Sequence, residues 1–344
     1  MMKKVNTAMI AQQLNLSRNT VSRALNGSPA VNEKTKQIIF QTAIEMGYQK
    51  LKPFAEPDAP AVEIKNETGR DICLLINDKL IHGTSFWDEI LRGIQSSCGF
   101  EFYETIVGLV GDDAVKQLKP PAALQNHKPS GIVMFGIYPE DYYKAITSLN
   151  VPMVTIDVFS EFKEHQMDYD VVMMSGMSCV YEITSEFIRE GLTDIAFVGA
   201  DMSKTIRERR DGYKLAMADH GLLPDPAYEI LGINGWESGD RMNDIVAALP
   251  RIPQAMVCMN DDTVFRLIKR AMKQVYGNAA DHVRYSGFDD FWQNYNENMV
   301  RGYKTVSFDR KKLGEMAAKQ ILFRLQNPEF PYVVLRIESK IVTY

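Results

Sequence analysis

The chain has 344 residues, of which 45% are hydrophobic, and its 39 basic and 44 acidic side chains give a net charge of −5. This length predicts two or three domains with a sizeable core, and the absence of any run of eighteen apolar residues argues against a membrane-spanning helix. The first residues contain two lysines and then turn polar, without the apolar stretch of a signal peptide, so we expect a cytoplasmic protein.

The four cysteines and five histidines are scattered along the chain. No Cys-x-x-Cys pair and no metal-ligand spacing occurs among them. Most of the cysteines are therefore expected to be small buried apolar side chains in a reducing compartment. The sequence predicts neither a metal nor an organic cofactor.

Residues 7–26 have the pattern of two short helices separated by a polar turn, which is the size of a helix-turn-helix DNA reader. Apolar side chains recur at helical spacing at 10, 11 and 14 and again at 21, 24 and 25. Ser17 stands where the N-cap of the second helix is expected. Arg18, Asn19 and Arg23 then point away from the apolar stripe, and such side chains can read base edges in a major groove.

A third helix is expected at 35–47, after a turn at 26–29 that contains Gly27 and Pro29. Its inner side is predicted to carry Ile38, Ile39, Thr42 and Met46. Residues 1–52 contain eight Lys or Arg and two Glu, a net of +6, so the remainder carries −11. Phosphate neutralisation needs such a local basic surface. The alternative is a set of ordinary surface helices.

Three segments carry a resemblance to a known family: VSRALNGSP at 21–29, VNEKT at 31–35 and MGY at 46–48. Through them the chain resembles the lac/gal repressor (LacI/GalR) family of bacterial transcription regulators. The resemblance implies that Arg18, Asn19 and Arg23 contact bases. It also implies phosphate contacts from Thr7, Ser17, Thr20, Ser22 and Asn26.

The headpiece, residues 1–50, is followed by a polar linker at 51–69 that contains Pro53, Pro57 and Pro60. This linker departs from the family pattern, in which a short hinge helix places a leucine wedge in the minor groove. Leu51 or Phe54 could provide a wedge, but the sequence predicts no helix after either of them. It therefore predicts neither a hinge helix nor operator bending.

From residue 71 onward, apolar runs that suit buried strands alternate with stretches that suit helices. Strands are expected at 71–77, 100–107, 131–136, 152–157, 195–199, 228–231, 255–259 and 283–288. Helices are expected at 89–97 and near 139–149, 176–190, 206–219, 238–249, 261–276 and 309–326. This alternation predicts an α/β domain at 70–344, with two doubly wound parallel sheets and a ligand site beyond the carboxyl ends of the strands.

The residues at these expected strand ends suit a sugar pocket, because carboxylates, amides and guanidinium groups bond vicinal hydroxyls and aromatic faces cover the apolar side of a sugar ring. The candidates are Trp87, Asp157, Thr205, Arg209, Trp236, Asn260 and Asp289. Asp261 and Asp290 are also at strand ends, and the alternative for them is helix capping.

The resemblance continues through this second part, in the segments 207–213, 259–261, 286–290 and 304–309. It implies a two-lobed fold like that of periplasmic binding proteins. It also implies that Arg209, Asn260 and Asp289 bind the effector and that Trp236 stacks on it. Phe308 replaces a residue that is commonly polar in the family. Trp87 and the layout of 131–200 are most similar to the galactoside-responsive branch.

These observations predict a homodimeric repressor that binds a palindromic operator and whose DNA affinity is controlled by a small sugar. Dimer contacts are expected from 263–275 and from the helix near Trp87, although the apolar residues of these helices could equally be core. Alternatives are a sugar-transport binding protein, a regulator that senses nothing, and one that senses a nucleoside or a phosphosugar. An enzyme is not expected, because no hydrolase elbow, P-loop or dinucleotide fingerprint occurs.

Overall fold

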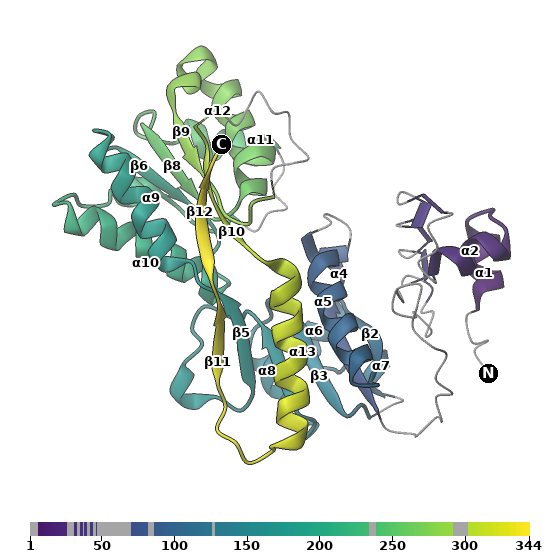
Figure 1. Cartoon of the computed structure of the whole chain (residues 1–344). Coiled ribbons are helices and arrows are strands. Elements are labelled where there is room, and N and C mark those ends of the chain that lie inside the picture. The colour runs from purple at the N-terminus through teal and green to yellow at the C-terminus, as the bar shows by residue number, and fades with distance from the viewer. Residues whose placement is uncertain are drawn as a thin grey trace. The chain divides into compact units, whose positions relative to one another are not determined.

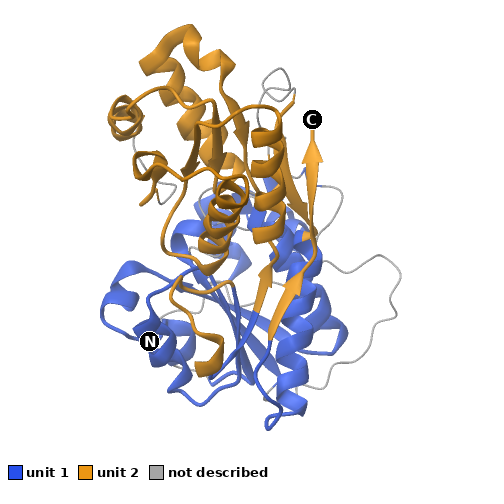
Figure 2. Ribbon diagram, turned by 90° about the vertical axis from the view of Figure 1, so that its left-hand side faces the viewer, with its two compact units in different colours: residues 1–156, 167–171, 310–333 blue, residues 157–166, 172–309, 334–344 orange. Residues whose placement is uncertain are grey.

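A computed structural model describes residues 6–25, 31–32, 35–36, 38–39, 42–43, 46, 70–81, 86–125, 128–233, 239–291 and 302–344. The linker expected at 51–69 lies outside these residues, as do Asn26 and Trp236. The chain folds into two compact units (Figure 2). The first comprises 1–156, 167–171 and 310–333, and the second comprises 157–166, 172–309 and 334–344. In the described part of the chain, no helix combines the length and the apolar character that crossing a bilayer requires.

The headpiece contains α1 (Thr7–Gln13) and α2 (Arg18–Leu25), with further helical residues between 35 and 43 (Figure 1). The side chain of Asn6 caps α1, and the hydroxyl of Ser17 accepts a hydrogen bond from the Thr20 amide at 3.0 Å, which confirms the predicted cap of α2. Its core contains the expected apolar stripes and additional residues: Ile10, Ala11, Val21, Ala24, Leu25, Val31, Ile39 and Ala43.

One residue of the expected third helix is placed differently. Ile39 is fully buried and Thr42 is buried, as predicted, but Ile38 is 48% exposed. The buried stripe instead continues from Ile39 to Ala43, four residues later. Because neighbouring helical residues are separated by about 100° around the axis, Ile38 cannot share this face with both.

The sheet of the first unit has the order β11-β5-β4-β3-β1-β2, and its strand β11 and the last residues of β5 come from the chain segments 334–344 and 172–309 of the second unit. Its strands are β1 (Asp71–Asn77), β2 (Glu104–Val110), β3 (Gly131–Phe135), β4 (Met153–Ile156), β5 (Asp170–Met174) and β11 (Val334–Ile337). The pairs β1–β2, β1–β3 and β3–β4 are parallel. The helices of this unit are α4 (Asp78–Ile81), α5 (Phe86–Phe100), α6 (Asp112–Lys116), α7 (Ala122–Gln125), α8 (Glu140–Thr147) and α13 (Arg310–Gln326).

Helices α5 and α13 lie side by side on this sheet (Figure 1). A Cβ atom at Gly93 would overlap the Lys311 carbonyl, and one at Gly314 would overlap the Ile90 carbonyl, so the two glycines allow the close approach. At the other end of α13, Arg324 forms an ion pair with Asp170 of β5, and both side chains are almost completely buried. This pair joins the last turn of the helix to the sheet.

The second unit is built on the sheet β12-β10-β9-β8-β6-β7. Its strands are β6 (Ile195–Val198), β7 (Glu229–Ile230), β8 (Ala255–Cys258), β9 (Arg284–Ser286), β10 (Lys304–Phe308) and β12 (Ser339–Thr343). The pair β10–β12 is antiparallel, and the pairs β9–β10, β6–β7, β6–β8 and β8–β9 are parallel. The helices are α9 (Met177–Arg189), α10 (Lys204–Asp219), α11 (Gly239–Ala247), a π-helical turn (Thr263–Ile268) and α12 (Lys269–Tyr276), with 3₁₀ turns at Glu164–Gln166, Pro226–Tyr228 and Gly277–His282.

The two predicted βα halves are confirmed, with differences in individual elements. Helix α5 extends to Phe100, so β2 begins at Glu104 and not at 100 as expected. Strands β5, β11 and β12 were not predicted. β11 and β12 are edge strands that carry charged residues, and edge strands have a weaker apolar signal than buried central ones. Cys73, Cys98 and Cys258 are buried free thiols, as expected for most of the cysteines.

Candidate functional site

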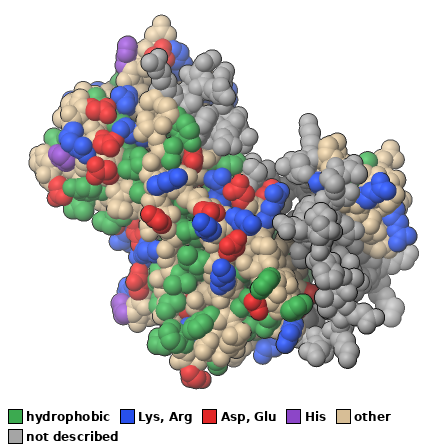
Figure 3. Space-filling model, in the orientation of Figure 1, with side chains coloured by type: hydrophobic (Ala, Val, Ile, Leu, Met, Phe, Trp, Pro, Cys, Tyr) green, Lys and Arg blue, Asp and Glu red, His purple; other side chains and the backbone are tan. Residues whose placement is uncertain are grey.

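The front of α2 carries the three side chains that were predicted to contact bases. Arg18, Asn19 and Arg23 are all exposed, whereas Val21, Ala24 and Leu25 on the back of the helix are buried. Cationic side chains are visible over this part of the headpiece in Figure 3. The sequence makes this helix amphipathic, and burial of its apolar stripe fixes which side faces outward.

The residues predicted to contact phosphates also bond within the headpiece. Ser17 and Thr20 share a hydrogen bond between their hydroxyl groups at 2.8 Å. Arg18 Nε donates to the Thr7 hydroxyl at 3.4 Å and so joins the starts of α2 and α1. Ser22 is half-buried. The hydroxyls of Thr7, Ser17 and Thr20 thus lie close to the exposed Arg18, where backbone amides at a helix start can also contact a phosphate.

In the second unit, Asp157 and Thr205 are brought together directly. The Asp157 carboxylate accepts hydrogen bonds from the hydroxyls of Ser203 at 2.6 Å and Thr205 at 2.5 Å, and from the Val158 amide at 2.8 Å. Burial raises the pKa of Asp157, and these hydrogen bonds oppose that rise. The carboxylate therefore fixes the segment after β4 to the start of α10. Ser203, which the sequence analysis missed, is also the side-chain cap of this helix.

Arg209 is 5% exposed and lies in the middle of this arrangement. Its Nη1 donates to the Met259 carbonyl at 2.5 Å, at the carboxyl end of β8, and its guanidinium lies 3.5 Å from the centroid of the Phe288 ring. Its buried Nε has no hydrogen-bond partner among the residues that the structure describes. Burial lowers the pKa of Arg209, while nearby Asp289 and Asp157 raise it. A buried donor without a partner is costly, and a ligand oxygen could satisfy it.

Asn260 and Asp261 follow β8 and have different partners. Asn260 Oδ1 accepts from the amide and hydroxyl of Thr263, at 2.9 and 2.7 Å, so it caps the turn that follows. Asp261 is fully buried. Its carboxylate accepts 2.7 Å hydrogen bonds from the hydroxyls of Tyr303 and Thr305 and from the Phe291 amide. Burial raises the pKa of Asp261 to about 7, against the effect of these donors.

Within the described residues, Asp261 and Asp290 bond side chains that are far away in sequence. Asp261 bonds the residues at the start of β10, and Asp290 Oδ1 accepts from the Tyr344 hydroxyl at 2.6 Å. Tyr303, Thr305 and Tyr344 are far away in sequence, so no local spacing could have predicted these bonds. The signal that was present is the clustering of acids at strand ends.

The backbone at three of these acids is unusual. Asp157, Asp289 and Asp290 have φ values of +61°, +97° and +51°. Positive φ is uncommon for residues other than glycine, and such strain gathers at binding sites. Asp289 is held there by its amide, which donates to the Val306 carbonyl at 2.9 Å. It is also the acid with the largest effect on the pKa of Arg209.

Two tryptophans were also predicted to line the effector site. Trp87 is half-buried on α5 in the first unit, and its ring makes edge contacts with Phe86 and Phe135, both at 4.6 Å between centroids. Phe135 is the last residue of β3, so Trp87 does lie near a strand end of its own unit. Trp236 lies outside the described residues. Among the residues described, no group of His, Cys, Asp and Glu could hold a metal ion.

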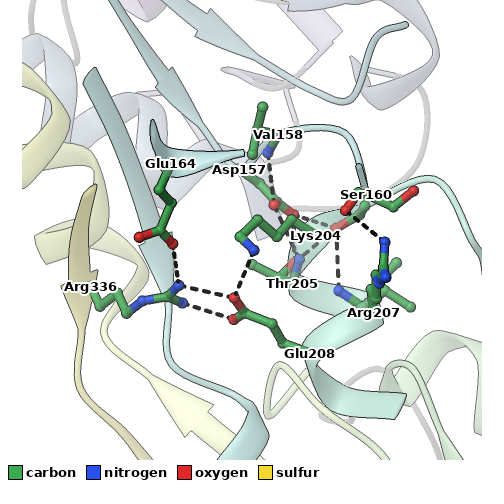
Figure 4. A network of polar contacts seen from close by, with 11 residues as sticks. Asp157, Val158, Ser160, Glu164, Lys204, Thr205, Arg207, Glu208 and Arg336 are labelled. Carbon is green, nitrogen blue, oxygen red and sulfur yellow. Dashed lines mark hydrogen bonds and ion pairs between the residues drawn. The ribbon is translucent and has the colours of Figure 1, made fainter. Parts of the chain in front are cut away.

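A network of charges continues from the site along α10 (Figure 4). Glu208 precedes Arg209 on this helix. Its carboxylate accepts two hydrogen bonds from Arg336 of β11, at 2.8 and 2.9 Å. Arg336 also lies 3.5 Å from Glu164, and Lys204 lies 3.6 Å from Glu208. Arg207 reaches the Ser160 carbonyl at 3.4 Å. The helix that carries Arg209 is thus fixed to the segments at 157–166 and 334–344.

Replacement of Glu208 by alanine is expected to lower the free energy of unfolding by about 1.5–3 kcal/mol, because two charge-assisted hydrogen bonds to Arg336 are lost. Glu182→Ala is the matched control, since Glu182 also accepts from an arginine, Arg189, at 2.8 Å, but in an exposed pair. We expect that control to lose about 0–1 kcal/mol. Urea unfolding measures the free energy of unfolding of both variants. Equal losses would show that the Glu208–Arg336 pair stabilises the fold no more than an exposed pair does.

The fold and this site define a class of protein: a two-unit α/β binding protein whose strand ends present buried Arg209 among carboxylates, preceded by a helix-turn-helix headpiece. The family model described as "Periplasmic binding proteins and sugar binding domain of LacI family" matches residues 70–329. The chain therefore belongs to the LacI/GalR family. The galactoside-responsive branch has no support beyond the resemblance.

Curated relatives match nearly the full length. The chain is 25% identical over 328 residues to the Probable HTH-type transcriptional repressor ExuR of Bacillus subtilis (strain 168), which covers 93% of this chain and 91% of the relative. It is 22% identical to the Ribose operon repressor of Haemophilus influenzae, with 97% and 96% covered. These relatives are transcriptional repressors by name, and family members are regulators and not enzymes.

Solved structures share the fold. The transcriptional regulator CelR in complex with cellobiose superimposes with a TM-score of 0.69 at 19% identity, over 99% of each chain. The lac repressor dimer bound to operator and the anti-inducer ONPF superimposes with a TM-score of 0.61 at 18% identity, over 99% of this chain and 98% of that one. These matches include the headpiece as well as the two parallel-sheet units.

Proposed function

We propose that this protein is a transcriptional repressor that binds a palindromic operator as a homodimer and whose DNA affinity is controlled by an uncharged sugar. One observation carries the proposal: a single chain joins an exposed Arg-Asn-Arg face on α2 to a strand-end site built around buried Arg209. The names of the relatives support it, since they include an operator-bound dimer and a cellobiose complex.

For the DNA-binding step, Arg18, Asn19 and Arg23 are the proposed base contacts. A helix whose back is buried presents these side chains at one surface, where a guanidinium can bond the O6 and N7 atoms of a guanine together. The proposed phosphate contacts are Thr7, Ser17, Thr20, Ser22 and Asn26. Two copies on a two-fold axis would read two half-sites, which is why a palindromic operator is expected.

Replacement of Arg23 by alanine is expected to weaken specific operator binding by about 1–3 kcal/mol, because one bidentate base contact is lost. A gel-shift titration against the operator measures this loss, and a scrambled duplex of the same length is the control, since binding to it depends on phosphates. If Arg23→Ala binds the operator as tightly as the unchanged protein, α2 is not the recognition helix.

For the effector step, the proposed contacts are Asp157, Thr205, Arg209, Asn260 and Asp289, together with Trp87 and Trp236. The described part of this site already contains several carboxylates around one guanidinium. An added phosphate or carboxylate would meet Asp289 and Asp157 as well as Arg209, and like charges at short range are unfavourable. Paired acceptors and donors suit the hydroxyls of a neutral sugar better, which favours a sugar over a phosphosugar.

The mechanism follows from linkage. If the sugar binds one conformation of the effector-binding part more tightly, operator affinity changes by that difference in affinity and by no more. Release from DNA is the expected direction. The alternative of a solute-binding protein for transport has no use for a base-reading helix, and loss of DNA binding in Arg23→Ala is an effect that this alternative does not predict.

The experiment is an operator titration of the purified full chain with and without a panel of ribose, galactose, lactose, cellobiose and glucose 6-phosphate. Release by one of the neutral sugars supports the proposal and identifies the effector. Release by glucose 6-phosphate alone would contradict the charge argument at Arg209. Specific binding that none of these compounds changes would contradict sugar control within this panel and leave the DNA-binding step standing.

A further inference from the structure

Asp261 binds both ends of the short segment that carries Asp289. Its backbone amide donates to the Phe288 carbonyl at 2.9 Å, and its Oδ2 accepts from the Phe291 amide at 2.7 Å. Asp289 and Asp290 lie between these two bonds in the sequence. One residue after β8 therefore fixes the beginning and the end of the segment that follows β9.

The backbone between these two bonds has an unfavourable conformation. The φ values of Asp289 and Asp290 are +97° and +51°, and such conformations persist only where the surrounding structure holds them. The Asp290 amide donates to the Thr305 hydroxyl oxygen at 3.4 Å, and the Thr305 hydroxyl donates to Asp261 Oδ1 at 2.7 Å. The Asp261 carboxylate therefore holds both peptide groups that follow Asp289, one of them directly and the other through Thr305.

The Asp261 carboxylate also packs directly against the end of β9. Gly287 follows this strand, and a Cβ atom there would overlap both Asp261 Oδ1 and the Tyr303 hydroxyl. Oδ1 accepts a hydrogen bond from that hydroxyl at 2.7 Å. Because Asp261 has no exposed surface, a change in its hydrogen bonds is passed on to the groups that pack against it.

In the described part of the chain, neutral donors bond the Asp261 carboxylate: two hydroxyls and one amide. Burial raises the pKa values of Cys258 on β8 and of Tyr303 beside β10, so both side chains stay neutral. The charges that act on Asp261 or feel its charge include those of Asp289 and Arg209. Burial raises the pKa of Asp261 to about 7, and Asp289 adds to this rise, so the carboxyl exchanges its proton in the neutral pH range.

The proton changes how Asp261 bonds its neighbours. An ionised carboxylate accepts from all three donors, whereas a protonated one has to donate from one of its oxygens. The hydroxyls of Tyr303 and Thr305 can turn and accept that bond, but the Phe291 amide can only donate. A neutral carboxyl is also a weaker acceptor than a carboxylate. Protonation of Asp261 therefore weakens the bonds that hold the segment after Asp289.

We propose that Asp261 is a positioning residue of the effector site, which in its ionised form holds Asp289 and the adjacent Asn260 in the geometry that binds the sugar. This inference rests on the proposed function, in which both of those residues contact the sugar. Asp261 acts through them and does not itself contact the sugar. Because the sugar binds the ionised form more tightly, binding releases a proton, and the affinity rises as the pH rises through about 7.

The test is a calorimetric titration of the full chain, at pH 6 and at pH 8, with the neutral sugars of the panel. We expect up to about tenfold tighter binding at pH 8, which is the limit for a group that titrates near pH 7 and has to be ionised. Asp261→Asn keeps the shape of the side chain but cannot ionise, so it should bind more weakly and equally at both pH values. A merely structural role would lower the affinity and leave the pH ratio unchanged.

Asp194→Asn is the matched control, because it removes an acid that pairs with Arg251 before β6, and it should keep the full pH ratio. Tyr303→Phe keeps the test valid if Asp261→Asn does not fold, which circular dichroism would reveal. This variant removes a donor that favours the ionised form of Asp261, so the pH at which the affinity changes should move upward. The normal pH ratio in Asp261→Asn, or an unmoved pH profile in Tyr303→Phe, would overturn the inference.

A measurement without sugar separates this inference from the proposed function. Trp292 follows Phe291 in the sequence, so we expect its fluorescence to respond to the bonds of that segment. In the double variant Trp87→Phe and Trp236→Phe, the emission should change with a midpoint near pH 7, and addition of Asp261→Asn should abolish this transition. A transition in a protein that binds no sugar of the panel would contradict sugar control but support the role of Asp261. No transition in the double variant would overturn that role, whichever sugar binds.

Discussion

Replacement of Arg324 by alanine is expected to lower the free energy of unfolding by about 3–5 kcal/mol, because it leaves the Asp170 carboxylate charged and buried without its partner. Asp170 has no exposed surface and Arg324 is 3% exposed. Two hydrogen bonds join them, at 2.9 Å from Nε and 2.8 Å from Nη2. Arg324 also donates to the Pro328, Phe330 and Pro331 carbonyls, so its loss frees the turn after α13 as well.

Urea unfolding measures this change as a shift in midpoint. Lys311→Ala is the matched control on the same helix, since the Lys311–Glu315 pair is exposed and 3.8 Å long, and its loss is expected to stay within about 0.5 kcal/mol. Addition of Asp170→Asn to Arg324→Ala should recover part of the stability, because the buried charge disappears while Oδ1 still accepts from the Val333 amide at 2.9 Å. A loss below about 1 kcal/mol for Arg324→Ala would contradict the importance of the pair.

Replacement of Asp289 by alanine is expected to abolish the response to the sugar and to leave operator affinity unchanged. Asp289 is held at φ +97° at the end of β9 and is the acid with the largest effect on the pKa of Arg209. Its removal takes away an acceptor for ligand hydroxyls and leaves Arg209 without its main compensating charge. An unpaired hydrogen-bonding group in a site built for hydroxyls can reduce affinity by several orders of magnitude.

The neighbouring residue supplies the control for this experiment. Asp290 also has positive φ, but its carboxylate bonds the Tyr344 hydroxyl. Asp290→Ala should therefore lose some stability and keep the sugar response. Operator titrations of both variants with the sugar found in the panel measure the difference. A normal response in Asp289→Ala, or an equal loss in both variants, would remove Asp289 from the proposed site.

The spacing of apolar residues was sufficient to predict the helices that bury one face and the strands that are buried on both faces. The stripes on α1 and α2 and the apolar runs of β1, β3, β6 and β8 are all where they were expected. The same spacing gave wrong or missing elements where the burial of a residue depends on contacts with distant parts of the chain. Phe100 was assigned to a strand but ends α5 with 80% of its surface exposed, and the charged edge strands β11 and β12 escaped notice.

For the candidate site, the sequence could predict which residues stand at strand ends but not what each carboxylate bonds. Asp157 is committed to Ser203 and Thr205, and Asp261 to Tyr303 and Thr305. These partners lie 42 to 48 residues away in the chain, so only the folded structure brings them together. Arg209 therefore becomes the main candidate for a ligand contact, because its buried Nε has no partner within the described part of the chain.

The most direct test of DNA reading combined with sugar control is a selection of binding sequences from a random DNA library by the full chain, followed by titration of the selected duplex with the sugar panel. We expect one palindrome with two half-sites to be enriched, bound steeply with respect to salt, and released by a single neutral sugar. Enrichment of no palindrome, or a selected duplex whose affinity no sugar in the panel changes, would contradict the proposed function.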